Sequence, residues 1–502
     1  MENNIVKIEN ISKSFPGTLA NDNVTFNIAN QSVHALLGEN GAGKSTLVKI
    51  LYGMLENDSG DIFFENKIFK IKSPLEARKF GIGMVFQHFS LFDSLTVAEN
   101  LILGLDDNIS FIDLKKKVEL LSNKYELPLD LESPITNLSA GEKQRVEIIR
   151  ILLQNPKLLI MDEPTSVLTP NEVEKLFITL KKLIQDGKTI LYITHKLEEV
   201  IRICDTVTIM RNGKVVETCS SQNESEKTLA TKMLGKKLPE IKKIYTINKY
   251  NKITFEINNL STNYNDPFLV NLDNISLKVK EGEIFGIAGV AGNGQTELMN
   301  MLTGEEIQKN SNSIKFLGKN ISHLDPMQRR NISISFVPED RLGHSAIPQL
   351  SLIDNVLLSQ YGGNNYTKLG IINNDSILKK TEEIISNFKV VTTGANSYAG
   401  SLSGGNLQKF VIGREILSNP KLLIISHPTW GIDAGAELSI RQSLIDLSNK
   451  GTSIIVISQD IDELLEITNN IAVIYKGKLS ETLQTDKITI DQLGLLMGGK
   501  FE

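Results

Sequence analysis

Two kinds of hydrophobic pattern alternate along the chain. Short runs that are apolar on both faces, such as VHALL (33–37), KLLIM (157–161) and TILYIT (189–194), are typical of strands inside a parallel sheet. Amphipathic stretches of helical period separate these runs, which predicts an α/β fold with helices covering the sheet. The opening segments IVKIENI and VTFNI favour antiparallel strands, and residues 88–155 read as a mainly helical subdomain.

The pattern occurs twice, and each copy contains two glycine-rich motifs at equivalent places. GENGAGKS (38–45) shares its frame with GVAGNGQT (289–296), and LSAGEKQR (138–145) shares its frame with LSGGNLQK (402–409). A repeat unit of this length indicates a duplicated domain rather than a solenoid repeat.

The separation of equivalent positions grows between these two motifs, so the second copy contains an insertion. We expect part of it in the polar loop YGGNNYTKLG (361–370), because Gly and Asn clusters favour loops. We predict one domain at 1–238, a short basic linker at 239–251 and a second domain at 252–502.

Length and composition agree with this division. A chain of 502 residues is too long for one ordinary core, and 41% hydrophobic with 23% charged residues is typical of a soluble globular protein. The net charge of −5 argues against bulk nucleic acid as the main partner. Two cysteines, Cys204 and Cys219, indicate a reducing compartment. Without a secretory signal or a long apolar run, we expect any membrane component to be another chain.

The first glycine-rich segment stands between a predicted strand and a predicted helix, the context that a P-loop requires. Its glycines allow backbone N–H groups to surround phosphates, and the helix N-terminus adds positive potential. Lys44 is expected to pair with the β- and γ-phosphates, and Ser45 to ligate Mg²⁺. The predicted ATP-binding residues here are Gly38, Glu39, Asn40, Gly41, Ala42, Gly43, Lys44, Ser45 and Thr46.

The apolar segment LLIMDEP (158–164) ends in two carboxylates. Asp162 is suited to hold Mg²⁺ through water, and Glu163 to polarise the water that attacks the γ-phosphate. An acidic strand end that only meets solvent is the alternative, but the upstream P-loop favours the catalytic interpretation.

Each LSxG segment sets a serine at a predicted helix start. Ser139 with Glu142 also fits a capping box, so a structural cap is the alternative. The recurrence at equivalent places favours function. Gly404 and Gly405 permit close approach to a phosphate, whereas Ala140 puts a methyl group at the corresponding place in the first copy.

P-loop, LSGG, DEP and a downstream histidine, in this order, resemble the ATP-binding-cassette ATPases over nearly the whole chain. The resemblance implies two tandem P-loop cassettes, each with a RecA-like core, an antiparallel β subdomain and a helical signature subdomain. It also implies an intramolecular cassette dimer in which the LSGG of one cassette closes over the P-loop of the other.

The resemblance also assigns single residues. Phe15 and Tyr264 look like the aromatic platforms that stack on adenine, with a core aromatic as the alternative. Gln87 in MVFQH looks like the glutamine that links Mg²⁺ and the γ-phosphate to the helical subdomain, and His195 in YITHK like the switch histidine. Thr169 stands where the family has an aspartate, which the second copy retains as Asp433.

The second copy has lost the residues that carry chemistry. Gln295 replaces the P-loop lysine, and a lysine about 4 Å from a phosphate charge contributes about 4 kcal/mol at an effective dielectric near 20. Ser426 and His427 replace Asp162 and Glu163. We therefore predict a second site without hydrolysis.

The head-to-tail pairing then implies one competent composite site, in which the first P-loop, Gln87, Asp162, Glu163 and His195 are closed by the second signature, Ser403, Gly404 and Gly405. Glu339 stands where the first copy has Gln87. The degenerate site is expected to comprise Tyr264, Gly289, Gly294, Gln295, Thr296, Ser426, His427, Gln459, Ser139 and Gly141.

Tandem cassettes with a degenerate second half resemble the ATPase subunits of bacterial importers for simple sugars and nucleosides. GMVFQHFSLFDSLTVAENLILG (83–104), GIAGVAGNGQTEL (286–298) and FVPEDR (336–341) favour the nucleoside branch. This implies ATP and Mg²⁺, two permease subunits or a permease dimer, an extracytoplasmic solute-binding protein as an indirect partner, no nucleic acid, and a peripheral location at the cytoplasmic face of the inner membrane.

The apolar residues after Gln87 are expected to meet the permease or to belong to the subdomain core; they are His88, Phe89, Leu91 and Phe92.

Three other functions remain open: the same role in a ribose-type sugar importer, a soluble tandem-cassette factor acting on ribosomes or DNA, and a nucleotide-sensing regulator that does not turn over. The short linker and the broken second copy disfavour the soluble factor. The intact Glu163 and His195 disfavour the regulator.

Overall fold

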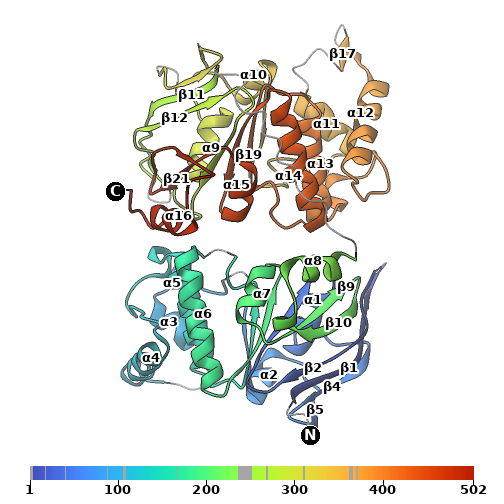
Figure 1. Cartoon of the computed structure of the whole chain (residues 1–502), viewed down its shortest axis with the longest axis vertical. Helices are drawn as coiled ribbons and strands as arrows, with labels where there is room; N and C mark the ends of the chain where they lie inside the picture. Colours follow the sequence, from blue (N-terminus) through green and yellow to red (C-terminus); the bar gives the residue numbers. More distant parts are fainter. Residues whose placement is uncertain are drawn as a thin grey trace. The chain divides into compact units, whose positions relative to one another are not determined.

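The structure is a computed structural model of the chain. It describes every residue except 1–3, 17, 40, 88, 106–108, 167, 236–251, 267–268, 309–310, 361–365, 369–370, 433 and 502. The chain divides into two compact units, Met1–Leu238 and Pro239–Glu502 (Figure 1). The linker expected at 239–251 lies outside the described residues.

The first unit opens with an antiparallel sheet in the strand order β2-β1-β4-β5. Val6 and Ile8 of β1 are both buried, because side chains two residues apart on a strand share one face. This confirms the antiparallel strands expected from the opening segments. The bounds are β1 Asn4–Phe15, β2 Thr18–Ala29, β4 Ser59–Phe64 and β5 Lys67–Ile68.

The second sheet of this unit has the order β10-β9-β3-β8-β7-β6. All pairings from β9 to β6 are parallel, and only the edge strand β10 runs antiparallel to β9. The bounds are β3 Val33–Gly38, β6 Ile82–Val85, β7 Leu158–Asp162, β8 Thr189–Thr194, β9 Thr206–Arg211 and β10 Lys214–Ser220. The three apolar runs of the sequence are buried strands here, as predicted.

Helices complete the first unit. The stretch 88–155 contains α3, α4 and α5, so the predicted helical subdomain is confirmed. The bounds are α1 Lys44–Leu51, α2 Pro74–Phe80, α3 Val97–Leu103, α4 Phe111–Tyr125, α5 Ala140–Leu152, α6 Pro170–Gln185, α7 Leu197–Ile203 and α8 Glu226–Leu234, with 3-10 turns at Ile135–Asn137 and Ser221–Asn223.

The second unit repeats this plan. Its antiparallel sheet has the order β12-β11-β14-β15, and its mainly parallel sheet the order β16-β19-β20-β13-β21-β22, with β23 also paired to β21. The bounds are β11 Ile253–Leu260, β12 Ile275–Lys280, β13 Ile284–Ala288, β14 Ile314–Phe316, β15 Lys319–Asn320, β16 Ile334–Val337, β19 Leu422–Ser426, β20 Ser453–Ser458, β21 Asn470–Tyr475, β22 Lys478–Leu479 and β23 Leu483–Gln484.

Helices α11, α12 and α13 gather at one end of the second unit, beside its parallel sheet (Figure 1). The helix bounds are α9 Gln295–Thr303, α10 Pro326–Asn331, α11 Leu352–Gln360, α12 Asn374–Asn387, α13 Gly404–Ile416, α14 Ala434–Asn449, α15 Ile461–Ile467 and α16 Ile490–Met497, with a 3-10 turn at Ala399–Ser401.

The polar segment at 361–370 is only partly described. Within its described part β17 (Thr367–Lys368) pairs antiparallel with β18 (Ile371–Ile372), where the sequence predicted a plain loop. The two strands lie between α11 and α12 in the chain, which agrees with an insertion into the helical subdomain.

Parallel strands β3, β8 and β7 are neighbours, so their carboxyl ends meet at one edge of the sheet in the first unit. This edge is where open α/β sheets bind ligands. Among the residues that the structure describes, no helix is both long enough and apolar enough to cross a lipid bilayer.

Candidate functional site

The turn between β3 and α1 is shaped by glycine. Gly43 has φ +97°, and a Cβ there would lie 2.3 Å from the carbonyl oxygen of Ala20, so only glycine fits. The turn leads directly into Lys44, whose side chain is buried.

Lys44 is held inside this turn. Its Nζ donates to the carbonyl oxygens of Gly38 at 2.6 Å and Glu39 at 3.0 Å. Burial lowers the pKa of Lys44, and the charges of Glu163 and Asp162 oppose that shift. A buried ammonium with only neutral acceptors at its tip is a strong potential partner for an anionic phosphate oxygen.

Glu163 follows β7 in a left-handed backbone conformation, with φ +47°. Its N–H donates to the carbonyl oxygen of Ile193 at 2.9 Å, which fixes the residue beside β8. Gln87 Nε2 donates to Glu163 Oε2 at 2.8 Å, and His195 Nδ1 lies 3.0 Å from Glu163 Oε1. Three residues predicted from separate motifs therefore meet at one carboxylate.

The surroundings keep this carboxylate ionised. Burial raises the pKa of Glu163, but the hydrogen bond from His195 and the charges of His195 and Lys44 outweigh it, so the pKa lies below its ordinary value. An ionised carboxylate can accept a proton from water at neutral pH. The His195 side chain is half exposed, which leaves this side of the site open to solvent.

The other first-copy residues surround this centre. Asp162 is the last residue of β7, and Ser45 is exposed in the first turn of α1. Hydroxyl, carboxylate and amide oxygens suit Mg²⁺, so Ser45, Asp162 and Gln87 form a chemically suitable donor set. Asn40 lies outside the described residues. Phe15 ends β1 with 44% of its side chain exposed, so it is not a core aromatic.

The two signature serines have different surroundings. Ser139 caps α5 in a complete capping box, because Glu142 N donates to Ser139 Oγ and Ser139 N donates to Glu142 Oε2 at 2.9 Å. A Cβ at Gly141 would lie 1.9 Å from Glu172 Oε1, so this signature is crowded from α6. Glu172 also forms the cap of α6 with Thr169, and Asp433 lies outside the described residues.

The second signature is open. Ser403 caps α13, and its Oγ accepts hydrogen bonds from Asn406. A Cβ at Gly405 would meet no atom closer than 3.7 Å. Ser403 and Gly404 are both exposed.

The second P-loop keeps the backbone of the first and loses its charge. Gly292 and Gly294 have φ +79° and +107°, against +82° and +97° at Gly41 and Gly43. Gln295 Nε2 donates to the carbonyl oxygen of Val290 at 2.7 Å, and its Oε1 accepts from Asn293 N at 3.1 Å. Both ends of this amide are thus engaged within the loop.

Sequence reasoning missed Glu297 and the anchoring of Tyr264. Glu297 replaces Thr46; it is buried in α9 and accepts a hydrogen bond from Val270 N at 2.9 Å. The change from hydroxyl to carboxylate was readable in the alignment of the two copies. Tyr264 is half-buried and donates to Glu306; burial, followed by this hydrogen bond, raises the pKa of Tyr264.

His427 occupies the place of Glu163 with the same backbone. Its φ is +47°, and its N–H donates to the carbonyl oxygen of Ile457 at 2.8 Å. Burial lowers the pKa of His427 to about 4, so the imidazole is neutral at pH 7. Ser426 is buried at the end of β19, and Gln459 follows β20. The second copy has the frame of the site without its carboxylate base.

A family model described as ABC transporter matches residues 21–166 and 272–430, the stretches that hold both P-loops and both DEP-type segments. The chain belongs to the ABC transporter family. Its two units are therefore ATP-binding cassettes, and the chain is an ATPase of this family.

Full-length relatives are importer components. The nucleoside import ATP-binding protein NupA of Lactococcus lactis subsp. cremoris is 38% identical, covering 99% of this chain and 98% of the relative. The guanosine import ATP-binding protein NupO of Bacillus subtilis is 38% identical, with 99% and 97% covered. The ribose import ATP-binding protein RbsA of Lactococcus lactis subsp. cremoris is 36% identical, with 99% and 100% covered.

Solved structures support the tandem-cassette fold. A structure titled RNase-L Inhibitor has a TM-score of 0.65 at 18% identity and covers 99% of this chain and 93% of that one. The complex of archaeal ribosomal stalk protein aP1 with the recycling factor aABCE1 gives 0.64 at 17% identity, covering 97% and 92%. At these identities the likeness concerns the fold alone.

Proposed function

We propose that this ATPase powers the import of nucleosides and that its first cassette carries the hydrolytic chemistry. The observation that carries the proposal is the contact of Gln87 and His195 with the two oxygens of Glu163, at 2.8 and 3.0 Å. In the second cassette a neutral imidazole stands in place of that carboxylate.

Each predicted site residue of the first cassette has a proposed role in hydrolysis. The P-loop amides and Lys44 bind the β- and γ-phosphates, and Ser45, Asp162 and Gln87 hold Mg²⁺. When bound, Mg²⁺ neutralises charge on the phosphate oxygens. Water attacks the γ-phosphorus, the bond to the β-phosphate oxygen breaks with its electrons remaining on ADP, and Glu163 accepts the proton of the water. His195 orients Glu163 and contacts the γ-phosphate.

The second cassette contributes its signature. Ser403, Gly404 and Gly405 are proposed to close over the ATP of the first P-loop, in keeping with the pairing implied by the family. Support comes from the exposure of Gly404, from Gly405, where a Cβ would meet no atom closer than 3.7 Å, and from the crowding of Gly141 by Glu172 in the other signature. The intact P-loop and the open signature thus belong to one proposed site.

The solute is assigned from the relatives. Two of them, at 38% identity over nearly the full length, are named for nucleoside and guanosine import, while ribose and galactose importers match at 35–36%. We assign nucleosides as solute, a permease dimer or two permease subunits as membrane partner, an extracytoplasmic binding protein as solute donor, and a peripheral position on the cytoplasmic face of the cell membrane.

The test of the catalytic assignment compares equivalent positions in the two cassettes. Glu163→Gln should abolish ATP turnover of the full chain with its permease, because the proton acceptor is lost. His427→Ala should leave turnover nearly unchanged, and phosphate release measures both. Similar losses from both substitutions would disprove the one-site model.

A further inference from the structure

An arginine lies against the open signature of the second cassette. Arg341, the last residue of FVPEDR, belongs to the segment between β16 and α11. A Cβ on Gly404 would lie 3.0 Å from its Nη1, and a Cβ on Gly431 would lie 3.1 Å from its Nη2. The guanidinium therefore rests on two glycine backbones, one of them in the signature itself.

Among the residues that the structure describes, Arg341 donates to a backbone carbonyl oxygen and not to a carboxylate. Its Nη2 donates to the carbonyl oxygen of Trp430, and the guanidinium lies 6.0 Å from the centre of the Trp430 ring. Burial lowers the pKa of Arg341, and no acidic group within the described parts of the chain forms an ion pair with it. A partly desolvated cation with neutral partners is stabilised by an incoming anion.

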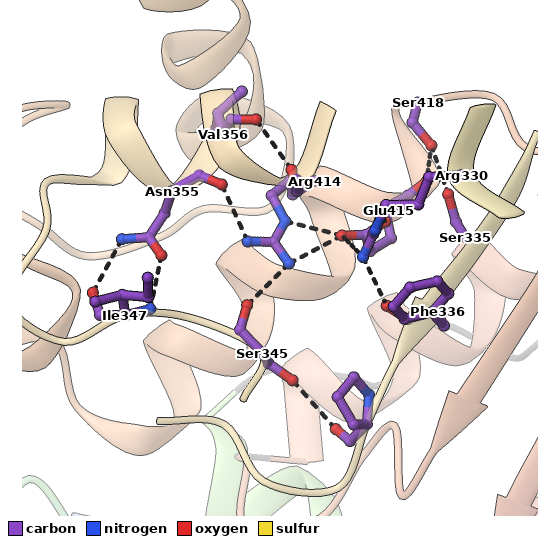
Figure 2. Close-up of polar contacts among 12 residues, drawn as sticks. Arg330, Ser335, Phe336, Ser345, Ile347, Asn355, Val356, Arg414, Glu415 and Ser418 are labelled. Carbon is purple, nitrogen blue, oxygen red and sulfur yellow. Dashed lines mark hydrogen bonds and ion pairs between the residues drawn. The ribbon is translucent and has the colours of Figure 1, made fainter. Parts of the chain in front are cut away.

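The segment that carries Arg341 is anchored to the signature helix, and Figure 2 shows the contacts of Ser345 and Ile347 in this segment. Arg414, buried in α13, donates from Nη2 to the carbonyl oxygen of Ser345 at 2.9 Å. Ser345 Oγ donates to the carbonyl oxygen of Pro338 at 3.2 Å, and Asn355 holds both the N–H and the carbonyl oxygen of Ile347. The helix that begins at the signature thus also fixes the segment on either side of Arg341.

The side chain of Arg414 is held in place by an ion pair with Glu415. Its Nε donates to Glu415 Oε1 at 2.9 Å, and Arg330 Nη1 donates to Glu415 Oε2 at 2.7 Å (Figure 2). Because Arg414 and Glu415 are almost fully buried, their positions are fixed by packing as well as by hydrogen bonds. This arrangement orients the segment before any ligand arrives.

The first cassette anchors its corresponding segment in a similar way, because Arg150 donates to the carbonyl oxygen of Ser90 at 2.6 Å and Asn100 holds both the N–H and the carbonyl oxygen of Phe92, but it has no arginine there. Phe89 stands where the second cassette has Arg341, and Ala140 stands where it has Gly404. The carboxylate is placed differently in α5, where Glu147 pairs with Arg150 and accepts a hydrogen bond from Ser90 N at 2.8 Å. Within this chain, the arginine accompanies only the open signature.

We propose that Arg341 is a phosphate-binding residue of the second signature and contacts the terminal phosphate of the ATP that is hydrolysed. This inference rests on the proposed pairing of that signature with the first P-loop. The forked donors of a guanidinium match the oxygens of a phosphate, and the exposed glycine of the signature leaves room for close approach. Arg341 then adds to Lys44 a second positive charge on the γ-phosphate.

The first experiment separates charge from local structure. In the full chain with its permease, Arg341→Gln and Arg341→Met should lower kcat/KM for ATP by about 10- to 100-fold, and Arg341→Lys should recover part of the loss. If Arg341 only held the loop around Trp430 in place, Gln and Lys would serve equally well at this position, because both can donate to a carbonyl oxygen. Equal activity of those two variants would overturn the proposal.

The second experiment separates ATP from ADP. In a Glu163→Gln background without turnover, Arg341→Gln should weaken binding of MgATP about tenfold or more and leave binding of MgADP unchanged, because ADP lacks the terminal phosphate. Equal effects on both nucleotides, or no effect on either, would contradict a γ-phosphate contact.

Leu342→Ala is the matched control, since Leu342 is the exposed neighbour in the same segment and should change neither affinity. The Glu163→Gln variant, measured without any change at Arg341, allows the two proposals to be tested separately. Residual turnover in that variant would refute the proposed function itself. Lost turnover there, with an unaffected Arg341→Gln variant, would refute only the role of Arg341.

Discussion

At residue scale, Glu163 and His427 show how one backbone position serves two chemistries. Both have φ +47°, and both donate their N–H to a carbonyl oxygen of the adjacent strand. The fold therefore determines where this side chain stands, whereas its identity determines whether a proton acceptor is present. Each substituted site position of the second cassette can therefore be compared with its counterpart in the first cassette.

The buried His427 predicts a pH effect on stability. Its folded pKa of about 4 lies below its unfolded value near 6.5, so the unfolded chain binds the proton first and stability falls as the pH drops from about 6.5 towards 4. His427→Gln should remove on the order of 2 kcal/mol of the stability difference between pH 7 and pH 5.

The measurement is the unfolding midpoint of both proteins at the two pH values. Replacing the exposed His323 by Gln serves as control and should leave the pH dependence as it is in the parent chain. An unchanged pH dependence in His427→Gln would show that this imidazole is not held neutral by burial.

At the scale of elements, the helices α5 and α13 begin alike and differ in what surrounds their first turn. Each starts at a capping serine. Glu172 of α6 crowds Gly141 in the first turn of α5, whereas a Cβ at the equivalent Gly405 of α13 would meet no atom closer than 3.7 Å. The same local sequence signal thus produces a capped helix in both cassettes, with a crowded first turn in one and a less crowded first turn in the other.

Substitution of these two serines should separate stability from activity. Ser139→Ala removes half of a complete capping box and should cost about 1 kcal/mol of folding stability with little change in turnover. Ser403→Ala should lower ATP turnover by about tenfold or more, because the proposed site loses a hydroxyl that binds phosphate. Thermal unfolding and phosphate release on both variants provide the test; a stronger loss of turnover in Ser139→Ala would reverse the assignment of signatures.

Much of each element was predictable because its signal is local. Apolar runs mark the strands β3, β7 and β8, and Ser or Thr followed by Glu marks the starts of α3, α5 and α6. Motif order also pointed to the trio of Gln87, Glu163 and His195, which the structure brings within 3.0 Å.

What the sequence did not reveal depends on contacts between distant segments. The contact between Arg341 and Trp430 joins residues that are far apart in the chain, and no hydrophobic periodicity predicts it. The hydrogen bond from Val270 N to the buried Glu297 of α9 likewise joins two segments that are separated in the chain. The pairing of β17 with β18 was missed because both strands are only two residues long and β17 lies in a polar segment.

At the scale of the whole molecule, the proposed mechanism gives the two cassettes different tasks. The first would supply the side chains that act on phosphate and water, and the second would supply its signature and Arg341. A chain organised in this way is expected to turn over ATP in response to its transport partners, since its relatives are importer components.

Solute-stimulated ATPase activity tests the assignment at this scale. The chain, reconstituted with its permease and binding protein, should hydrolyse ATP faster in the presence of nucleosides than in the presence of ribose or galactose. Stimulation by sugars alone would move the chain to the sugar importers. Stable association with ribosomes in place of membrane permeases would support the soluble tandem-cassette factor.

The two buried ion pairs have a consequence for the history of the duplication. In α5 the carboxylate is Glu147, three residues before its arginine, and in α13 it is Glu415, directly after its arginine. Exchange of α13 for α5 would take Glu415 away from Arg330, which lies outside the exchanged helix, and leaving a partly buried arginine without its carboxylate is destabilising. Recombination between the halves is therefore penalised, and each cassette is free to diverge without being corrected by the other.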